Sequence, residues 1–263
     1  MPKHSLLSLA ALFLAPLAAG CIDASSRQPC VEPGAAGATP PAAGAANAAS
    51  GATAAPVAAG ALKSCAGAVA AADGLIDDLE DGNQQVLVAL GRAGYWWLHH
   101  DPNGSTLLPE KFAPEDGGAG GSKKAVHVHG VTSSENGAYG SSVGLNIAEK
   151  GLYDGSQYVG LSFKAKVGPS ATKKVRLKIG DVNTHGQLGT CASCWNHFGK
   201  DLELSTEWKE YKVLFSELKQ ADGWGAPRPP TITPAQLASI DWTVGPGQTF
   251  DLWIDDVTFM GCP

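Results

Sequence analysis

The sequence predicts an all-β fold, an antiparallel two-sheet β-sandwich of jelly-roll type. Apolar and polar residues alternate with a period of two in several short segments, which is the signature of a strand. Gly, Pro, Asn and Ser turns separate these segments and give about nine to eleven strands. Many short strands without helices between them favour two packed sheets. A closed barrel is the alternative, and it requires a more even strand spacing.

The clearest strand is YVGLSFKAKV, residues 158–167, in which every second residue from Val159 to Val167 is apolar. Phe250, Leu252 and Ile254 alternate in the same way near the end of the chain. A helical turn or two is expected from Thr233, an N-cap, through Ala238. The expected strands, in chain order, are residues 85–90, 126–130, 142–147, 158–167, 175–179, 201–204, 211–215, 240–244 and 250–254.

The N-terminal region reads as an export signal followed by a tether. Its apolar run, Leu6 to Leu17, is too short to span a bilayer, and Leu-Ala-Ala-Gly precedes Cys21 as in a bacterial lipobox. We therefore expect a lipoprotein signal peptide at residues 1–20 and a lipid on Cys21. An ordinary signal peptide cut after a small residue is the alternative. Residues 21–62 are predicted to be a disordered, lipid-anchored linker rich in Ala, Gly and Pro, and residues 63–263 a folded domain.

This organisation predicts an exported protein that is anchored by lipid to the bacterial cell envelope, at the outer membrane or the cell surface. The formal net charge of -6 is spread along the chain without a basic stripe, which argues against a nucleic-acid partner. Contact with a membrane is expected only through the N-terminal lipid. We expect a monomer.

Five cysteines remain once Cys21 carries a lipid. An oxidising compartment favours their pairing. Cys65 and Cys262 bracket the folded region, and Cys191 and Cys194 lie close enough to pair locally. Cys30 is then the odd cysteine of the tether, either free or joined to another chain.

The segment HGQLGTCASCWNHFG, residues 185–199, carries the densest chemistry of the chain. His185, Cys191, Cys194 and His197 form a legitimate tetrahedral zinc set. A redox dithiol is a further alternative, although its usual βαβ context is absent. The favoured interpretation is a disulfide between the two cysteines, because neighbouring thiols oxidise in an exported domain. Such a disulfide would hold Trp195 and His197 in place for a ligand.

A second aromatic segment is GYWWLHHD, residues 94–101. Because neighbours on a strand point to opposite sides, at least one of Tyr95, Trp96 and Trp97 should be exposed. An exposed ring could stack on the apolar side of a sugar. Trp224 lies between glycines on a loop, whereas Trp208, Trp242 and Trp253 are predicted to be core residues. The candidate ligand-binding residues are Trp96, Asp181, His185, Trp195, His197 and Trp224.

Three segments carry a family resemblance. LIDDLEDG, YVGLSFKAK and FDLWIDDVTF resemble the opening, middle and closing motifs of non-catalytic carbohydrate-binding domains with the galactose-binding-like jelly-roll fold. Family 11 modules, which are attached to endoglucanases, are the nearest that can be named. TCASCWNHFG and EWKEYKVLFSELKQADGWG resemble a subgroup found in exported bacterial lipoproteins. The resemblance covers roughly residues 74–262 and implies the fold more specifically than the function.

Acidic residues lie at both ends of the folded region, in residues 77–82 and at Asp255-Asp256. First and last strands of a jelly roll are commonly neighbours, so these carboxylates could bind calcium together; solvated turns are the alternative. The resemblance implies a structural calcium at Glu80, with Asp78 and Asp255 as further ligands.

The leading functional hypothesis is non-catalytic binding of a polysaccharide through aromatic stacking. An enzyme is the alternative. A glycoside hydrolase needs two carboxylates, for which the candidates are Glu203, Glu207 and Glu210. A lyase needs a basic constellation on one sheet face, for which the candidates are Arg176, Lys178 and His127 or His129. A structural or adhesive surface protein, linked through Cys30, is the third hypothesis.

Overall fold

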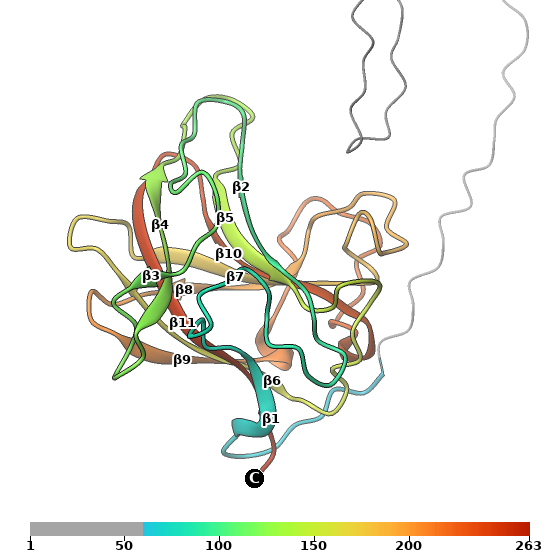
Figure 1. Ribbon diagram of the computed structural model, residues 1–263. Coiled ribbons are helices and arrows are strands. Elements are labelled where there is room, and N and C mark those ends of the chain that lie inside the picture. The colour runs from blue at the N-terminus through green and yellow to red at the C-terminus, as the bar shows by residue number, and fades with distance from the viewer. Residues whose placement is uncertain (1–59) are drawn as a thin grey trace, which may run out of the picture. The chain divides into compact units, whose positions relative to one another are not determined.

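The computed structural model describes residues 60–263, and this part of the chain is an antiparallel β-sandwich (Figure 1). The predicted all-β fold is confirmed. The predicted signal peptide, the lipid on Cys21, Cys30 and nearly all of the linker lie outside the described residues. The strands are β1 Val69–Asp77, β2 Trp96–His100, β3 Glu115–Asp116, β4 Lys124–Val131, β5 Ser141–Asn146, β6 Gly160–Val167, β7 Lys174–Asp181, β8 Phe198–Glu203, β9 Lys209–Leu214, β10 Leu237–Val244 and β11 Thr249–Gly261.

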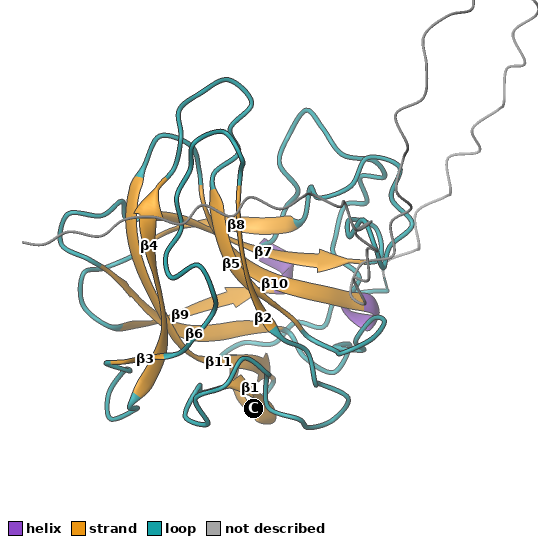
Figure 2. Ribbon diagram, turned by 45° about the horizontal axis from the view of Figure 1, so that its top comes forward, coloured by secondary structure: helices purple, strands orange, loops and turns teal. Residues whose placement is uncertain are grey.

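These strands form two sheets (Figure 2). One has the order β3-β4-β11-β6-β9, with β1 also pairing with β11. The other is the five-stranded sheet β2-β5-β10-β7-β8. Helical structure in the described residues is limited to two 3-10 turns, η1 Phe215–Glu217 and η2 Pro234–Gln236. Among the same residues, no helix has the length and apolar character needed to cross a membrane.

The core lies between the two sheets and follows the predicted alternation. Val159, Leu161, Phe163, Ala165 and Val167 are all buried, as expected for the strand at 158–167. The inward residues of β7, β10 and β11 join the same cluster. The centre of the core is aromatic, because the Trp242 ring stacks on one tryptophan of β2 and meets Phe163 edge-on.

The elements of the structure differ from the predicted ones in several places. Residues 85–90 form two isolated bridges rather than a strand, because Leu90 and Gly91 have positive φ values and turn the chain back on itself. β1 was not predicted, since its small residues show no alternation. The expected helix after Thr233 is the single turn η2, with Pro234 at its first position.

The two ends of the described domain are tied together. Cys65 and Cys262 form a disulfide, with their Cα atoms 5.7 Å apart, as the cysteine spacing predicted. β1 pairs with the last strand, β11, next to this bond. The chain therefore enters and leaves the sandwich at one point.

Candidate functional site

The five-stranded sheet has an outer face, turned away from the core, on which side chains from all five strands line up. The strand register places Trp97, Gly144, Asp241, Lys178 and Gly199 side by side, one from each of β2, β5, β10, β7 and β8. We call these five residues the central row. It joins an aromatic ring at one edge to a pair of opposite charges in the middle of the sheet.

A second row runs beside the central row and is polar throughout. It consists of His99, Ser142, Thr243, Arg176 and Asp201, again one residue from each strand. The hydroxyls of Ser142 and Thr243 lie 2.9 Å apart, and Thr243 donates to Oδ1 of Asp241 at 2.9 Å. Arg176 pairs with Asp201 at 2.8 Å. Hydroxyl, amine and guanidinium groups are therefore available on one surface to hydrogen-bond a polar ligand.

Outward-facing glycines allow large side chains to lie against the sheet. A Cβ on Gly144 would meet Cζ2 of Trp97 at 2.5 Å, so the indole occupies the space that a side chain would fill. A Cβ on Gly180 would meet Cε1 of His197 at 2.9 Å in the same way. The Trp97 indole packs on the backbone of β5 through Cζ2, and the residue as a whole is half-buried.

The middle of the central row is an ion pair between Lys178 and Asp241. Their Nζ and Oδ1 atoms are 3.0 Å apart, and the Asp241 side chain is 2% exposed whereas that of Lys178 is 22% exposed. A carboxylate so deeply buried needs its partner, because desolvation of an unpaired charge is costly. The pair also leaves the middle of the face without a net charge.

An aromatic column follows β2 along the edge of the face. Tyr95 is 44% exposed, Trp97 follows two residues later, and His99 is two residues further. The His99 ring stacks on Tyr139, and its Nε2 lies 3.0 Å from the tyrosine hydroxyl. Burial, followed by repulsion from His100 and Lys178, lowers the pKa of His99 from its usual value. A neutral imidazole therefore lies at this corner of the face near neutral pH.

The structure contradicts the predicted role of one residue in this segment. Trp96, which the sequence analysis chose as ligand-binding, is fully buried and stacks between Phe112 and Trp242. Its indole Nε1 donates to Asp77 at 2.7 Å. The outward tryptophan is its neighbour, Trp97. The signal was present in the sequence, because Leu98 is apolar and His99 polar, so the alternation turns Trp97 outward together with His99.

The loop between β7 and β8, residues 182–197, borders the opposite side of the face. Asp181, at the end of β7, is fully buried and accepts hydrogen bonds from the backbone of Asn183 and Thr233 and from the Thr184 hydroxyl. Burial raises its pKa. Asp181 therefore anchors the loop from inside, and its predicted role in contacting a ligand is not supported by its position.

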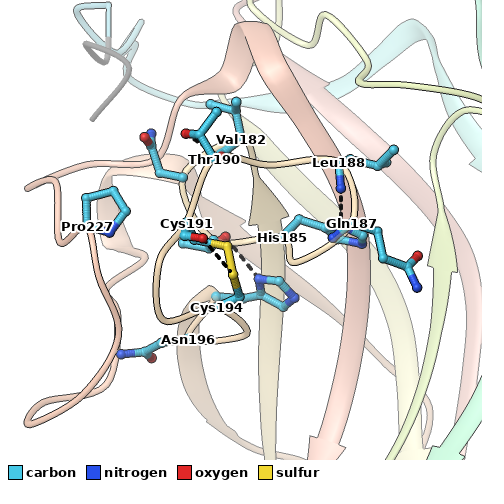
Figure 3. The surroundings of a disulfide bond; sticks show 12 residues. Val182, His185, Gln187, Leu188, Thr190, Cys191, Cys194, Asn196 and Pro227 are labelled. Atoms are coloured by element: carbon cyan, nitrogen blue, oxygen red, sulfur yellow. Dashed lines mark hydrogen bonds between the residues drawn. A yellow bond between two sulfur atoms is a disulfide. The ribbon is translucent and has the colours of Figure 1, made fainter. Parts of the chain in front are cut away.

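The predicted disulfide between Cys191 and Cys194 is confirmed (Figure 3). It leaves neither thiolate for the zinc alternative, whereas a disulfide is also the oxidised state of a redox dithiol. His185 instead accepts backbone hydrogen bonds from Gln187 and Leu188, and His197 lies 2.9 Å from the Thr184 hydroxyl. Across the described residues, no three His, Cys, Asp or Glu side chains are grouped as a metal site.

His185, Trp195 and His197 come together as predicted. The Trp195 ring meets the His185 ring edge-on with centroids 5.1 Å apart, and the two histidine rings stack at 5.9 Å. The two histidines are 6% exposed each, whereas Trp195 is 51% exposed. The histidines thus support the ring, and the indole alone is open to a large ligand.

Burial lowers the pKa of His197 from 6.5 to about 4, and repulsion from Lys178 and His185 acts in the same direction against the attraction of Asp241. Between these two values the unfolded chain binds a proton that the folded protein does not. The contribution of His197 to the free energy of unfolding is therefore fully present above pH 6.5, and it should fall by up to about 3 kcal/mol as the pH drops toward 4.

We expect His197→Gln to flatten this pH dependence of the free energy of unfolding, measured by urea unfolding from pH 7 to pH 4.5. Asp77, whose burial raises its pKa to about 6, contributes a slope of opposite sign. The free energy of unfolding of the wild type is therefore compared with that of the variant at each pH. The same dependence on pH in both proteins would contradict the prediction.

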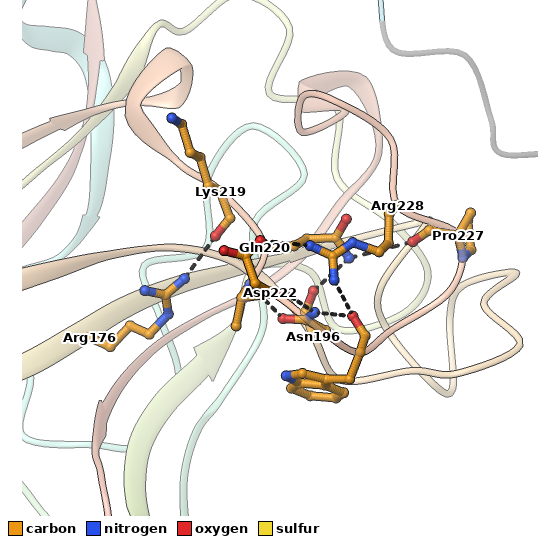
Figure 4. A network of polar contacts seen from close by, with 9 residues as sticks. Arg176, Asn196, Lys219, Gln220, Asp222, Pro227 and Arg228 are labelled. Atoms are coloured by element: carbon orange, nitrogen blue, oxygen red, sulfur yellow. Dashed lines mark hydrogen bonds and ion pairs between the residues drawn. The ribbon is translucent and has the colours of Figure 1, made fainter.

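Trp224 lies on a second loop, residues 219–230. Asn196 of the disulfide loop lies against this second loop, near Asp222 and Arg228 (Figure 4). The Asn196 amide donates to the carbonyls of Ala221 and Trp224, and Arg228 donates to the Trp224 carbonyl at 2.8 Å and pairs with Asp222. The backbone of this loop is therefore held on several sides. The Trp224 indole is 48% exposed, as predicted.

The predicted calcium ligands are held by hydrogen-bond donors. Oε1 of Glu80 accepts from the backbone of Lys123 and Lys124 and from the Ser122 hydroxyl. Asp255 accepts from the amides of Ala119 and Asp256, and Asp78 from that of Glu80. Each of these carboxylates accepts hydrogen bonds within the protein, and calcium at them stays a prediction.

The outer face of the other sheet has a different character. Trp253 lies between His127, with ring centroids 3.9 Å apart, and Lys166, whose Nζ also lies over Trp208. Trp208 and Trp253 are thus half-buried on this face, and only Trp242 of the three predicted core tryptophans is fully buried. Contacts on both sides of Trp253 leave it no free side for stacking.

The predicted enzyme constellations are not assembled. His127 and His129 lie on β4, in the other sheet from Arg176 and Lys178. Glu203 and Glu210 are exposed and belong to different sheets, and Glu207 is exposed on the loop between them.

Comparison with known proteins bears on the fold. No family model and no curated protein matches the sequence. A family 11 carbohydrate-binding module from Clostridium thermocellum, solved with a β-1,3-1,4-mixed-linked tetrasaccharide, superposes with a TM-score of 0.51 at 16% identity, covering 73% of this chain and 98% of that one. This chain has the fold of a carbohydrate-binding module. At this identity the similarity establishes the jelly-roll sandwich and not the ligand.

Two further modules from Clostridium thermocellum are similar. The family 11 module of the cellulosomal cellulase Lic26A-Cel5E has a TM-score of 0.49 at 14% identity, covering 76% of this chain and 98% of that one. The family 30 module of the cellulase Cel9D-Cel44B has a TM-score of 0.46 at 12% identity, covering 68% of this chain and 96% of that one. The resemblance stated from the sequence motifs is confirmed at the level of the jelly-roll fold by the family 11 module with a TM-score of 0.51.

Proposed function

We propose that this protein is a non-catalytic carbohydrate-binding protein that holds a polysaccharide on the outer face of its five-stranded sheet. The observation that carries the proposal is the central row. A tryptophan ring that packs on Gly144 lies in register with a buried ion pair and beside a polar row that includes two hydroxyls. An aromatic platform with adjacent polar groups matches the two-sided chemistry of a sugar ring, which is apolar on its faces and polar at its edges.

The dimensions of the face favour a chain over a single sugar. Four inter-strand steps separate β2 from β8, a distance of about 19 Å at ~4.8 Å a step. The ion pair leaves the middle of the face neutral, and this favours an uncharged glycan. A family 11 module was solved with a β-1,3-1,4-mixed-linked tetrasaccharide, so a β-glucan with this mixed linkage is our first candidate ligand.

The test is retention of the full chain on a panel of insoluble polysaccharides, and its mobility shift in gels that contain soluble ones, mixed-linked β-glucan included. We expect retention without release of reducing ends or of unsaturated products absorbing at 235 nm. Trp97→Ala should lower affinity by about tenfold or more, as loss of a central aromatic anchor does. Trp208→Ala, a tryptophan on the opposite sheet, is the matched control and should bind normally.

Absence of retention on every glycan would overturn the proposal, and product release would replace it with an enzyme. Parallel assays with calcium and with a chelator test the predicted structural calcium, which should raise the melting temperature if it is bound.

We also propose that Cys21 carries the lipid and that the protein is exported and held at the cell envelope. The support is the Leu-Ala-Ala-Gly-Cys segment alone. The mass of the N-terminal peptide from membrane-extracted protein tests it, and an unmodified Cys21 would contradict it.

A further inference from the structure

The two loops beyond the β7–β8 edge of the five-stranded sheet form one unit. Ser193 and Ala226 pair through two backbone hydrogen bonds, and the Ala192 amide donates to the same Ala226 carbonyl. Gly199 of β8 pairs with Lys219 at the foot of the second loop. We call residues 185–197 and 219–228 the paired loops. The first of them joins the adjacent ends of β7 and β8, and the second pairs with the free edge of β8 at Lys219, so both lie at the side of the sheet opposite to β2.

Each loop presents one exposed tryptophan. Trp195 comes two residues after Ser193, and Trp224 two residues before Ala226. Because the Ser193–Ala226 bridge is antiparallel, both tryptophans lie beyond the same end of it. They are 51% and 48% exposed. Two large apolar rings this open, on neighbouring loops, are a surface feature that marks an interaction site more often than chance exposure does.

Trp195 has the geometry of a platform. A Cβ on Gly186 would meet its Cζ2 at 2.5 Å, so one side of the indole packs on the backbone, as the Trp97 ring does on Gly144. Its amide donates to the Thr184 carbonyl at 2.8 Å, and its φ is 75°, a left-handed value that is strained for any residue except glycine. The fold maintains this strain next to a disulfide, and strained residues held in this way concentrate at functional sites.

A disulfide and hydrogen bonds that do not involve the two indole rings hold the unit together. The Cys191–Cys194 bond closes the turn directly before Trp195. The Asn196 amide bridges to the second loop through the Trp224 carbonyl, and Arg228 holds the same carbonyl (Figure 4). The loop backbones are held by these bonds. Each tryptophan remains about half exposed, at 51% and 48%.

We propose that Trp195 and Trp224 form a second aromatic subsite, which takes further sugar rings of the same neutral glycan chain that Trp97 holds. This inference rests on the proposed function. Three inter-strand steps, about 14 Å at ~4.8 Å each, separate β2 from β7, so a ligand must be long to reach both ends. Between the two ends, Lys178 and Arg176, whose side chains are 22% and 26% exposed, offer polar groups along the path.

The test is the dependence of affinity on ligand length. Isothermal titration of the full chain uses a tetrasaccharide and an octasaccharide of mixed-linked β-1,3-1,4-glucan, or of whichever polysaccharide retains the protein in the panel above. We expect one binding site per chain and a clear affinity gain for the octasaccharide. Trp195→Ala and Trp224→Ala should each reduce that gain by about tenfold while leaving tetrasaccharide affinity within about twofold. Trp195→Phe, which keeps a ring, should retain most of the gain, and Trp208→Ala should retain all of it.

Each alternative outcome has a distinct meaning. An unchanged length dependence in both alanine variants would overturn the subsite while leaving binding on the sheet intact. An equal loss for both ligands would make Trp195 a support for the sheet face and would overturn it as well. Two binding sites per chain would show two independent sites instead of one continuous path. Failure of the wild type to bind any glycan would remove the proposed function and the subsite together.

Discussion

Replacement of both Cys65 and Cys262 by serine will destabilise the domain by about 5 kcal/mol, the largest effect that we expect from any change described here. The bond joins residues separated by 197 positions, so it restricts the unfolded chain strongly, and the entropy of that chain rises when the bond is lost. Urea unfolding at pH 7, followed by tryptophan fluorescence, measures the difference.

The chain offers a matched control for this effect. The bond between Cys191 and Cys194 spans a separation of 3, so its double serine variant should lose only about 2 kcal/mol by the same entropic argument. Equal losses in the two variants would show that loop length is not the dominant cause.

Lys178→Met will destabilise the protein by about 3 kcal/mol, because it leaves the Asp241 carboxylate 2% exposed and without its cation. This loss of stability lies at the lower end of the range for breaking a buried ion pair, because part of the Lys178 side chain is exposed. The double variant Lys178→Met with Asp241→Asn should recover most of the loss, because it removes the unpaired charge. Urea unfolding of the three proteins forms the comparison. A single variant as stable as the wild type would mean that water already solvates Asp241.

The strand pattern was predictable wherever one side of a strand faces the core. Residues 158–167 and 250–254 alternate clearly because burial on one side and solvent on the other select opposite residue types. β1 escaped prediction because its pairing with the last strand, and not its own Ala-rich sequence, makes it a strand. Segment 85–90 has strand-like residues, yet the turn at Leu90 and Gly91 folds it into a hairpin.

The candidate site was only partly predictable. The exposed Trp195 and Trp224 followed from loop residues and a local disulfide, which are short-range features. The central row depends on the register between strands far apart in sequence: Trp97 meets Gly144, and Asp241 meets Lys178. No local pattern specifies that register. Asp181 illustrates the same limit, because its burial depends on the distant Thr233 amide.

The packing of Trp97 on Gly144 also has a thermodynamic consequence. A ring that already rests against the backbone has few rotamers to lose, so the protein contributes little to the ordering cost of association. Most of that cost then falls on the ligand. A stiff, extended glycan, with little conformational entropy of its own to give up, should therefore be held more tightly than a flexible one that makes the same contacts.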